Sequence, residues 1–260
     1  MPFTLSHIAA VLPGYRPLTR AHVFTAAVIG SMVPDFGWFV PGAISRLQTH
    51  SITALLTFSL PVGLMAYWVT LLLIRPAMLE VVPDGAYVRL RAAPAVPSIT
   101  RPGSWLYAAA ALLLGAVTHL LWDAFTHENA RGVRMFPLLT DFGPEMAGHP
   151  LHLYRWLQYG SSIVGLALVA MALVLWLRHA PAPAEAPRRR IGLHERVVWL
   201  GAYVLPSLLI MAWAFTHSGA GGSSPFTNGE VLGAILIRGL QYLAASLLLV
   251  SAAIRARLAL

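Results

Sequence analysis

The fold is decided by the stretch Gly115-Ala-Val-Thr-His-Leu-Leu-Trp-Asp-Ala-Phe-Thr-His127, which ends an apolar segment long enough to cross a membrane. A charged side chain at membrane depth costs about 2.5–3.5 kcal/mol on insertion scales, so an ionisable residue there indicates a function or a partner. His119, Asp123 and His127 follow at intervals of four residues, which places them on one helical face. Such a face can bind a divalent metal ion. Alternatively, a hydrogen-bonded His–Asp pair packs two helices together.

The composition excludes an ordinary soluble domain. Of the 260 residues, 57% are hydrophobic and 11% are charged, as in a protein that spans a membrane several times. There is no cysteine, which excludes disulfides and thiolate metal sites. The formal net charge of +8 comes from arginine, since the chain contains no lysine. Because the arginines fall mostly between apolar segments, contact with membrane lipids explains them better than binding to nucleic acid.

Five segments of about 20 mainly apolar residues are long enough to span a hydrocarbon core. They are Ser51–Ile74, Trp105–Phe125, Trp156–Leu177, Val197–Phe215 and Val231–Ile254. We therefore predict an all-α fold, a polytopic transmembrane helical bundle with five clear spans plus a broken or re-entrant N-terminal helical segment. We expect one membrane domain over residues 1–260. Residues 1–178 carry the motifs, residues 179–195 form a cytoplasmic Pro/Ala/Arg linker, and residues 196–260 hold the last two spans.

The N-terminal segment is less regular. Thr4–Leu12 is a short helix candidate, and Ala21–Val33 is a second apolar stretch. Pro34-Asp35 interrupts this stretch before Phe36–Ile44 continues it. The interruption predicts a span broken at Pro34 or a re-entrant half-helix, because irregular backbone at membrane depth is tolerated where it lines a protein cavity.

The arginines orient the five clear spans. One side holds most of them: Arg75, Arg89, Arg91, Arg101, Arg178, Arg188, Arg189, Arg190, Arg196, Arg255 and Arg257. The other side has only Arg131, Arg134 and Arg155. Because cytoplasmic loops are enriched in arginine, we expect the arginine-rich loops to be cytoplasmic and the His/Asp residues to lie toward the outer face.

Three more residues join the candidate site. Asp35 lies in an apolar setting and requires a partner, His50 opens a spanning segment, and His7 lies in the first apolar run. Each has a structural alternative: Asp35 as a helix cap, His50 as an interfacial residue and His7 as a surface residue. Together with the 119–127 face they supply nitrogen and oxygen ligands without sulfur, which suit zinc, manganese or iron; zinc is our first choice for a hydrolytic site.

Helix geometry limits the metal hypothesis. Eight residues of continuous helix cover about 12 Å, so His119 and His127 cannot bind one ion unless the helix ends near Phe125. A centre of two ions about 3.5–4 Å apart, bridged by Asp123, would also bring both histidines into use. Alternatively only His119 and Asp123 are ligands, and His127 acts on the substrate or orients a ligand.

The loop over residues 128–155 is a candidate lid or substrate rim. It holds His149 and His152. The sequence does not decide whether these two residues bind substrate or only pack within the loop. Arg155 shares a helical face with Gln158 and Ser162 and could hold a phosphate group. Alternatively this face anchors the helix at the membrane interface.

Several motifs together resemble the DUF4184 family of bacterial integral membrane proteins. They are Met1-Pro-Phe-Thr-Leu-Ser-His7, Gly30-Ser-Met-Val-Pro-Asp35-Phe, His50-Ser51, the 115–127 stretch and Leu153-Tyr-Arg-Trp-Leu-Gln-Tyr-Gly-Ser-Ser162. The match runs from Met1 to about Trp176. It implies a protein of the bacterial cytoplasmic (inner) membrane and carries no established activity.

The chain is more distantly similar to the YdjM-like inner-membrane metal-dependent hydrolases. His7, Pro34-Asp35, Thr49-His50-Ser51 and Gly115–Thr126 follow the order of that group's motifs. This resemblance implies metal ligands at His7, Asp35, His50, His119 and Asp123. The chain departs from the group at Gly37 and Trp38, where two potential ligands are replaced, and Ser45-Arg46-Leu47 stands in place of a His-Arg-Gly.

Two classes of function follow. The first is a membrane-embedded hydrolase with one or two divalent ions, for which zinc is our choice, that acts on a lipid or lipid-linked (phospho)ester near the outer face. Asp123 and His127 would be catalytic, and Arg155, His149 and His152 would bind substrate. The second is a non-enzymatic membrane protein, structural, partner-binding or a transporter, with a buried His/Asp network. The sequence leaves the oligomeric state open.

Overall fold

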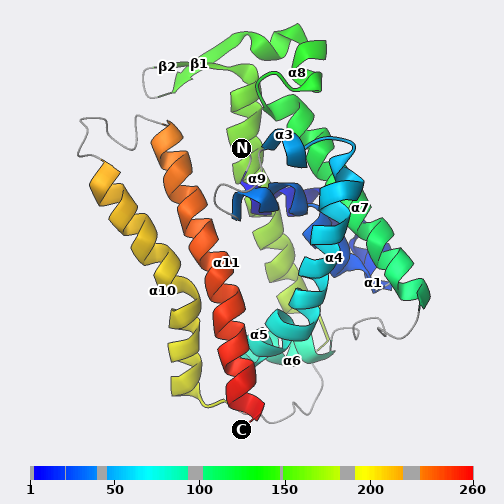
Figure 1. The fold of residues 1–260 in the computed structure, drawn as a ribbon, viewed down its shortest axis with the longest axis vertical. Helices are drawn as coiled ribbons and strands as arrows, with labels where there is room; N and C mark the ends of the chain where they lie inside the picture. The colour runs from blue at the N-terminus through cyan, green and yellow to red at the C-terminus, as the bar shows by residue number, and fades with distance from the viewer. Residues whose placement is uncertain are drawn as a thin grey trace. The chain divides into compact units, whose positions relative to one another are not determined.

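The computed structural model describes residues 3–20, 22–39, 46–92, 102–146, 149–181, 191–218 and 229–259. Within these ranges the protein is mostly helical, and five helices are long and apolar enough to cross a membrane. They are Leu55–Val81, Gly103–Thr126, Leu153–His179, Leu193–His217 and Gly233–Ala259. Each corresponds to one predicted span, which confirms the predicted fold class (Figure 1).

The chain forms two compact units. The first comprises Met1–Gly37, Ile44–Tyr67 and Pro94–His179. Its N-terminal elements are the 3-10 helix η1 (Thr4–Gly14), α1 (Tyr15–Arg20), α2 (Phe24–Gly30), the 3-10 helix η2 (Val33–Phe39) and α3 (Arg46–Thr49). A π-helix, η3 (Leu55–Ser59), and α4 (Leu60–Val69) follow. The two long helices are α7 (Pro102–Thr126) and α9 (Leu153–His179).

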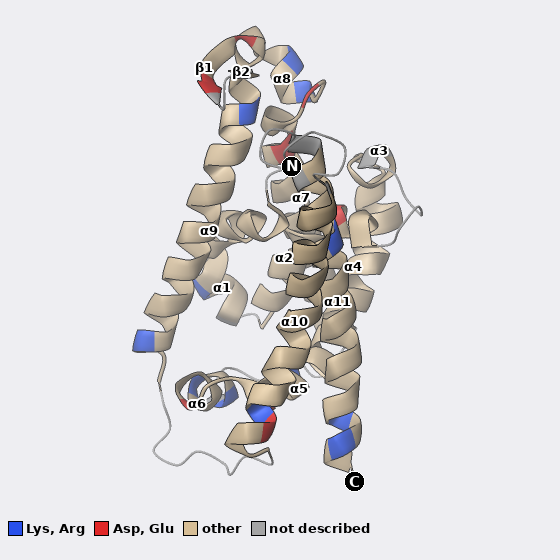
Figure 2. Ribbon diagram, turned by 90° about the vertical axis from the view of Figure 1, so that its left-hand side faces the viewer, with Lys and Arg blue, Asp and Glu red and all other residues tan. Residues whose placement is uncertain are grey.

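The second unit comprises Trp38–Ala43, Trp68–Ala93 and Ala180–Leu260. Its elements are the π-helix η4 (Thr70–Ile74), α5 (Arg75–Val81), α6 (Asp84–Ala92), α10 (Leu193–Ser218) and α11 (Gly229–Ala259). Its core gathers around Ala77, Tyr203 and Ile254. An ion pair of 2.7 Å between Arg196 and Asp84 ties α10 to α6. Figure 2 shows the charged residues mostly at helix ends and in the short elements, as the distribution of arginines in the sequence indicates.

The predicted break in the N-terminal segment is present. Helix α2 ends at Gly30, Ser31 and Met32 form a turn, and η2 then runs through Pro34. Proline lacks a backbone N–H, so it cannot continue the hydrogen bonds of α2. Residues 40–45 of the expected continuation lie outside the described residues, as do residues 182–190 of the expected linker.

The loop after α7 contains elements that its sequence does not signal. They are α8 (Arg131–Met135), the 3-10 helix η5 (Pro137–Thr140) and an antiparallel hairpin of β1 (Phe142–Met146) and β2 (His149–His152). Each is five residues or shorter, and the strands contain Pro144 and Pro150. Elements this short show no periodicity, and proline is unusual in paired strands.

The close approach of α2 and α7 positions the candidate site. A Cβ atom at Gly115 would collide with the carbonyl oxygen of Ala27, and one at Gly30 would collide with the carbonyl oxygen of Leu112. Only glycine permits backbones to lie this close. The contact brings the end of α2, with Ser31, beside the turn of α7 that carries His119.

We predict that Gly115→Ala destabilises the protein by about 1–3 kcal/mol, because the added methyl group overlaps backbone atoms that cannot rotate away. The matched control is Gly160→Ala on α9, where a Cβ meets no atom within 4 Å. Thermal unfolding of the detergent-solubilised protein measures both. Equal melting temperatures for the two variants would contradict the close contact.

Candidate metal centre

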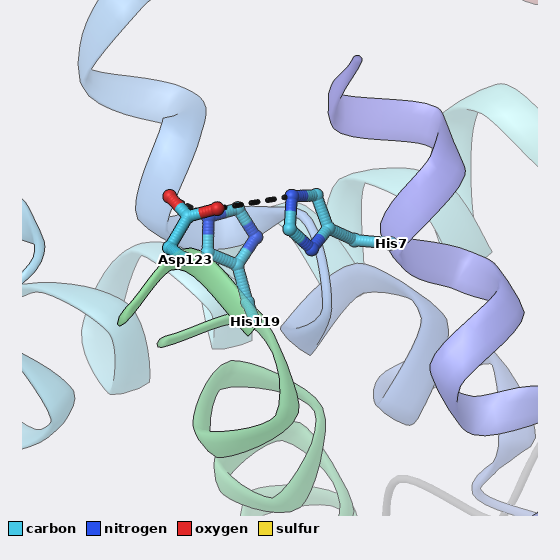
Figure 3. Close-up of side chains that lie close together, drawn as sticks. All are labelled: His7, His119 and Asp123. Atoms are coloured by element: carbon cyan, nitrogen blue, oxygen red, sulfur yellow. Dashed lines mark ion pairs between the residues drawn. The ribbon is translucent and has the colours of Figure 1, made fainter. Parts of the chain in front are cut away.

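Six of the predicted site residues gather in the first unit. His7 comes from η1, Asp35 from η2, and His50 follows α3. Helix α7 contributes His119 and Asp123, and His127 comes immediately after its last residue, Thr126. Figure 3 shows His7 and Asp123 pointing toward each other beside His119. The cluster therefore joins four segments that are far apart in the sequence.

The segment η1 is held against α9 by specific contacts. The backbone N–H of Phe3 donates a hydrogen bond of 3.0 Å to Ser162 Oγ. Gly165 lies one turn further along α9, where a Cβ would meet Ser6 at 2.8 Å. The small residues of α9 thus let η1 lie close enough to carry His7 into the cluster. This is the role that the structure gives to Ser162, on the face considered above for phosphate.

The orientation of His119 is fixed by a backbone group. Its Nδ1 lies 2.8 Å from the carbonyl oxygen of Ser31. A carbonyl oxygen only accepts hydrogen bonds, so Nδ1 carries the proton and a neutral ring presents the lone pair of Nε2 on its other side. Metal-binding histidines usually show this arrangement, with the second nitrogen donating to a carbonyl or carboxylate.

Four donor atoms lie close together in the cluster. His119 Nε2 lies 3.3 Å from His50 Nε2, 3.6 Å from Asp35 Oδ1 and 3.5 Å from Asp123 Oδ2. His50 Nε2 lies 3.3 Å from Asp35 Oδ1 and 3.4 Å from Asp123 Oδ2. These five distances form two nearly equilateral triangles of donor atoms that share the edge between the two histidines. We call these atoms of His50, His119, Asp35 and Asp123 the four-atom cage.

The size of the four-atom cage matches a metal ion. In a tetrahedral site each edge is about 1.6 times the metal–ligand distance, so edges of this length correspond to a metal–ligand distance of about 2.1 Å, as for zinc with nitrogen and oxygen ligands. Other combinations of these residues also meet the distance requirement: His7, His119 and Asp123 form one buried triad, and Asp35, His50 and His119 form another. The cluster could therefore hold a metal ion.

The remaining carboxylate oxygens face defined partners. Asp35 Oδ2 accepts a hydrogen bond of 2.7 Å from the Thr4 hydroxyl. Asp123 Oδ1 lies 3.5 Å from His7 Nε2 and 3.5 Å from His127 Nδ1. Thus one oxygen of each carboxylate belongs to the four-atom cage while the other is oriented from outside it.

His7 packs flat against a cage residue. Its ring stacks on that of His119, with centroids 3.8 Å apart. Burial lowers the pKa of His7 to about 4, so its ring is neutral at physiological pH and retains a lone pair. Its Nε2 is buried and has no hydrogen-bond partner among the described residues, which is consistent with a nitrogen that faces a cation.

The electrostatics of the cluster require positive charge. The side chains of Asp35 and Asp123 are at most 4% exposed, and a buried carboxylate is strongly destabilising unless it is neutralised. A proton held by the imidazoles, or a metal ion within the four-atom cage, would neutralise these carboxylates.

Helix α7 ends near Phe125, as it must if His127 is to lie near the same site as His119. Helix α7 ends at Thr126, so His127 turns back and its Nδ1 contacts both the backbone oxygen of Asp123, at 3.2 Å, and the side-chain oxygen Oδ1. Its side chain is 11% exposed and is the least buried of the six. The cluster is therefore most accessible at the end of α7.

The three residues expected at the substrate have other described contacts. His152 bonds the carbonyl oxygen of Thr140 through Nδ1 and stacks on Phe142 and Tyr154. The guanidinium of Arg155 lies over the ring of Tyr154. The backbone of His149 belongs to β2, and its side chain lies outside the described part. Substrate binding by these residues stays a prediction.

Several residues that support the site carry no clear signal in the sequence. Thr4 bonds Asp35, the Thr49 hydroxyl lies 2.9 Å from His50 Nδ1, and Ser31 orients His119 through its backbone. A threonine beside a histidine, as in Thr49-His50, is the one local pattern that suggests such support. A backbone carbonyl leaves no trace in side-chain chemistry, so the role of Ser31 requires the structure.

A sequence profile described as a domain of unknown function, DUF4184, matches residues 1–252. The chain belongs to the DUF4184 family. The match confirms the predicted resemblance and extends it beyond Trp176, through α10 and most of α11. No curated protein and no solved structure gives a match. The more distant similarity to metal-dependent hydrolases is not shown by these comparisons and stays a prediction.

We predict that Thr4→Val destabilises the protein by about 1.5–3 kcal/mol, because a buried carboxylate oxygen loses a charge-assisted hydrogen bond with little change in shape. Thr57→Val is the control, since the Thr57 hydroxyl bonds only a backbone carbonyl in an exposed position. Thermal unfolding measures the difference. Unchanged stability of Thr4→Val would show that Asp35 does not depend on this bond.

Proposed function

We propose that this DUF4184 protein is a membrane-embedded metal-dependent hydrolase that acts on a lipid or lipid-linked (phospho)ester. The observation that supports this most directly is the four-atom cage, in which two imidazole nitrogens 3.3 Å apart each lie 3.3–3.6 Å from the same two carboxylate oxygens. The Nε2 lone pair of a neutral His119 faces both buried carboxylates, which is unfavourable without a proton or a metal ion between them.

Zinc is the ion that we propose. The donor set contains nitrogen and oxygen without sulfur, and the spacing of its atoms suits the bond length of tetrahedral zinc, whereas octahedral oxygen sites suit magnesium or manganese. The two buried triads share His119, whose Nδ1 is committed to Ser31. Its single free nitrogen binds one ion, so one ion in the four-atom cage is the primary occupancy. A second ion would require Asp123 to bridge toward His7.

The residues around the four-atom cage support hydrolysis. A bound zinc ion lowers the pKa of a coordinated water to about 7 and polarises the group to be cleaved. His127 lies beside Asp123 and on the most accessible side of the cluster, where it can remove a proton from the attacking water and return it to the leaving oxygen. Asp123 would hold the ion through Oδ2 and orient His127 through Oδ1.

The substrate class follows from the setting. The cluster lies at the end of α7, a helix apolar enough to cross a membrane. At this position it would meet the part of a lipid near its headgroup, where the ester bonds of lipids lie. Arg155 at the start of α9 and His149 and His152 of the preceding strand β2 would bind the headgroup. The arginine-rich loops indicate that this side faces away from the cytoplasm of the bacterial inner membrane.

One observation favours a second candidate function. The four-atom cage offers four protein donors, whereas a catalytic zinc usually has three and keeps its fourth position open for water. The same cage would suit a structural ion that joins η2, α3 and α7, or a transported ion. A hydrolase requires water as a fifth ligand or the withdrawal of one protein ligand during the reaction.

We predict that the purified protein contains about one zinc ion per chain. Asp123→Asn, which keeps the size of the side chain and removes its charge, should lower the metal content strongly. His217→Ala is the control, because His217 packs on Trp213 at the end of α10. Elemental analysis with a parallel thermal unfolding curve provides the test. A folded, metal-free wild-type protein would exclude both metal-based functions.

We predict that His127→Gln retains the metal and lowers the rate of ester hydrolysis by about 10²–10⁴-fold, the usual contribution of a general acid–base group. The measurement uses fluorogenic short-chain esters and phosphodiesters presented in mixed micelles to wild type and variant of equal zinc content. Zinc-loaded wild type that hydrolyses none of them would favour the structural or transport function.

A further inference from the structure

The connection between α7 and α9 exposes an unusual number of large apolar side chains. The exposed fractions are 73% for Met135, 52% for Phe136, 67% for Leu138 and 65% for Phe142. We call these four residues the apolar rim. They lie outside the five long apolar helices, in or next to short elements of the connection. If this connection faced water, its exposed side chains would be mostly polar.

The apolar rim is held level with the last turn of α7. Asn129, with φ of 60°, reverses the chain directly after α7, and α8 then packs back on the helix. A Cβ at Gly132 would meet the carbonyl oxygen of Ala124 at 2.7 Å. The rings of Phe136 and Phe125 have centroids 5.9 Å apart. Residues in and after α8 therefore contact the last turn of α7.

The other half of the connection lies against the first turn of α9. The indole N–H of Trp156 donates a hydrogen bond of 3.0 Å to the carbonyl oxygen of Pro144. The ring of Phe142 stacks on His152, which stacks on Tyr154. Figure 1 shows α8 and the hairpin at the adjoining ends of α7 and α9. Both halves thus contact the ends of helices that are apolar enough to be spans.

The apolar rim continues the exposed apolar surface of α7. Leu121, Trp122 and Phe125 are exposed along the last two turns of that helix, and the contact between Phe125 and Phe136 joins them to the rim. Arg131 and Arg134 are exposed on the same short helix, α8. Apolar side chains beside arginines, with tryptophan at the boundary, are typical of segments that lie in the membrane interface.

We propose that the apolar rim inserts into the lipid leaflet at this end of α7 and α9, with the arginines of α8 at the phosphate groups. Lipid is the occupant that we infer, because the rim is continuous with a surface that a bilayer would cover. Insertion of about 5–10 Å is the usual depth for such segments. This inference goes beyond the proposed hydrolase and does not depend on the metal centre.

The absence of cysteine from the chain permits a direct test. Met135→Cys and Leu138→Cys are labelled with an environment-sensitive fluorophore and reconstituted into vesicles of phosphatidylcholine and phosphatidylglycerol. Glu145→Cys, an exposed polar position in β1, is the matched control. We expect blue-shifted emission at positions 135 and 138 and loss of that emission when the vesicles contain lipids with a shallow nitroxide. The control should show neither change.

Two results would overturn the proposal. Emission from positions 135 and 138 that is as red-shifted and as unquenched as that from position 145 would show that the rim faces water. Blue-shifted emission that nitroxide lipids do not quench would show that protein, such as a second copy of the chain, covers the rim. Melting temperatures equal to that of the wild type establish that each labelled variant is folded.

Discussion

The structure depends on how two buried carboxylates are neutralised. Asp35 and Asp123 lie within 3.6 Å of the same two imidazole nitrogens, in surroundings where neither charge can be solvated. The backbone bond from His119 to Ser31 prevents a neutral His119 from donating a proton to them. A cation at this position turns mutual repulsion into attraction. The N-terminal 3-10 helices and the end of α7 meet at these two carboxylates.

Close packing of the helices fixes the positions of the side chains around these carboxylates. The glycines at positions 30 and 115 let α2 and α7 touch through their backbones, which fixes the distance between Ser31 and His119. Ser162 and Gly165 of α9 contact the start of the chain and η1, the 3-10 helix that carries Thr4 and His7. Donor atoms placed this way are pre-organised, so an ion would bind with little rearrangement of the protein.

Much of this arrangement could be predicted from the sequence. Long apolar segments indicate helical spans because the bilayer allows few alternatives, and an ionisable residue such as Asp123 within one of them indicates a site. The order of the motifs, which resembles that of the YdjM-like hydrolases, predicted that His7, Asp35 and His50 belong to the same site as His119 and Asp123. Periodicity could not predict the hairpin or α8, which are too short. It also could not predict the roles of Ser31 and Thr4, since these depend on tertiary contacts between distant segments.

The contact between η1 and α9 has a consequence for biosynthesis. Phe3 and Ser162 are 159 positions apart, and chains emerge from the ribosome beginning with the N terminus. Until the third long apolar helix has been translated, the segment bearing His7 and Thr4 lacks the surface on which it rests. Before that moment nothing holds His7 beside His119 and Asp123. Any metal ion that the cluster binds would therefore be bound late in maturation, once the first compact unit is complete.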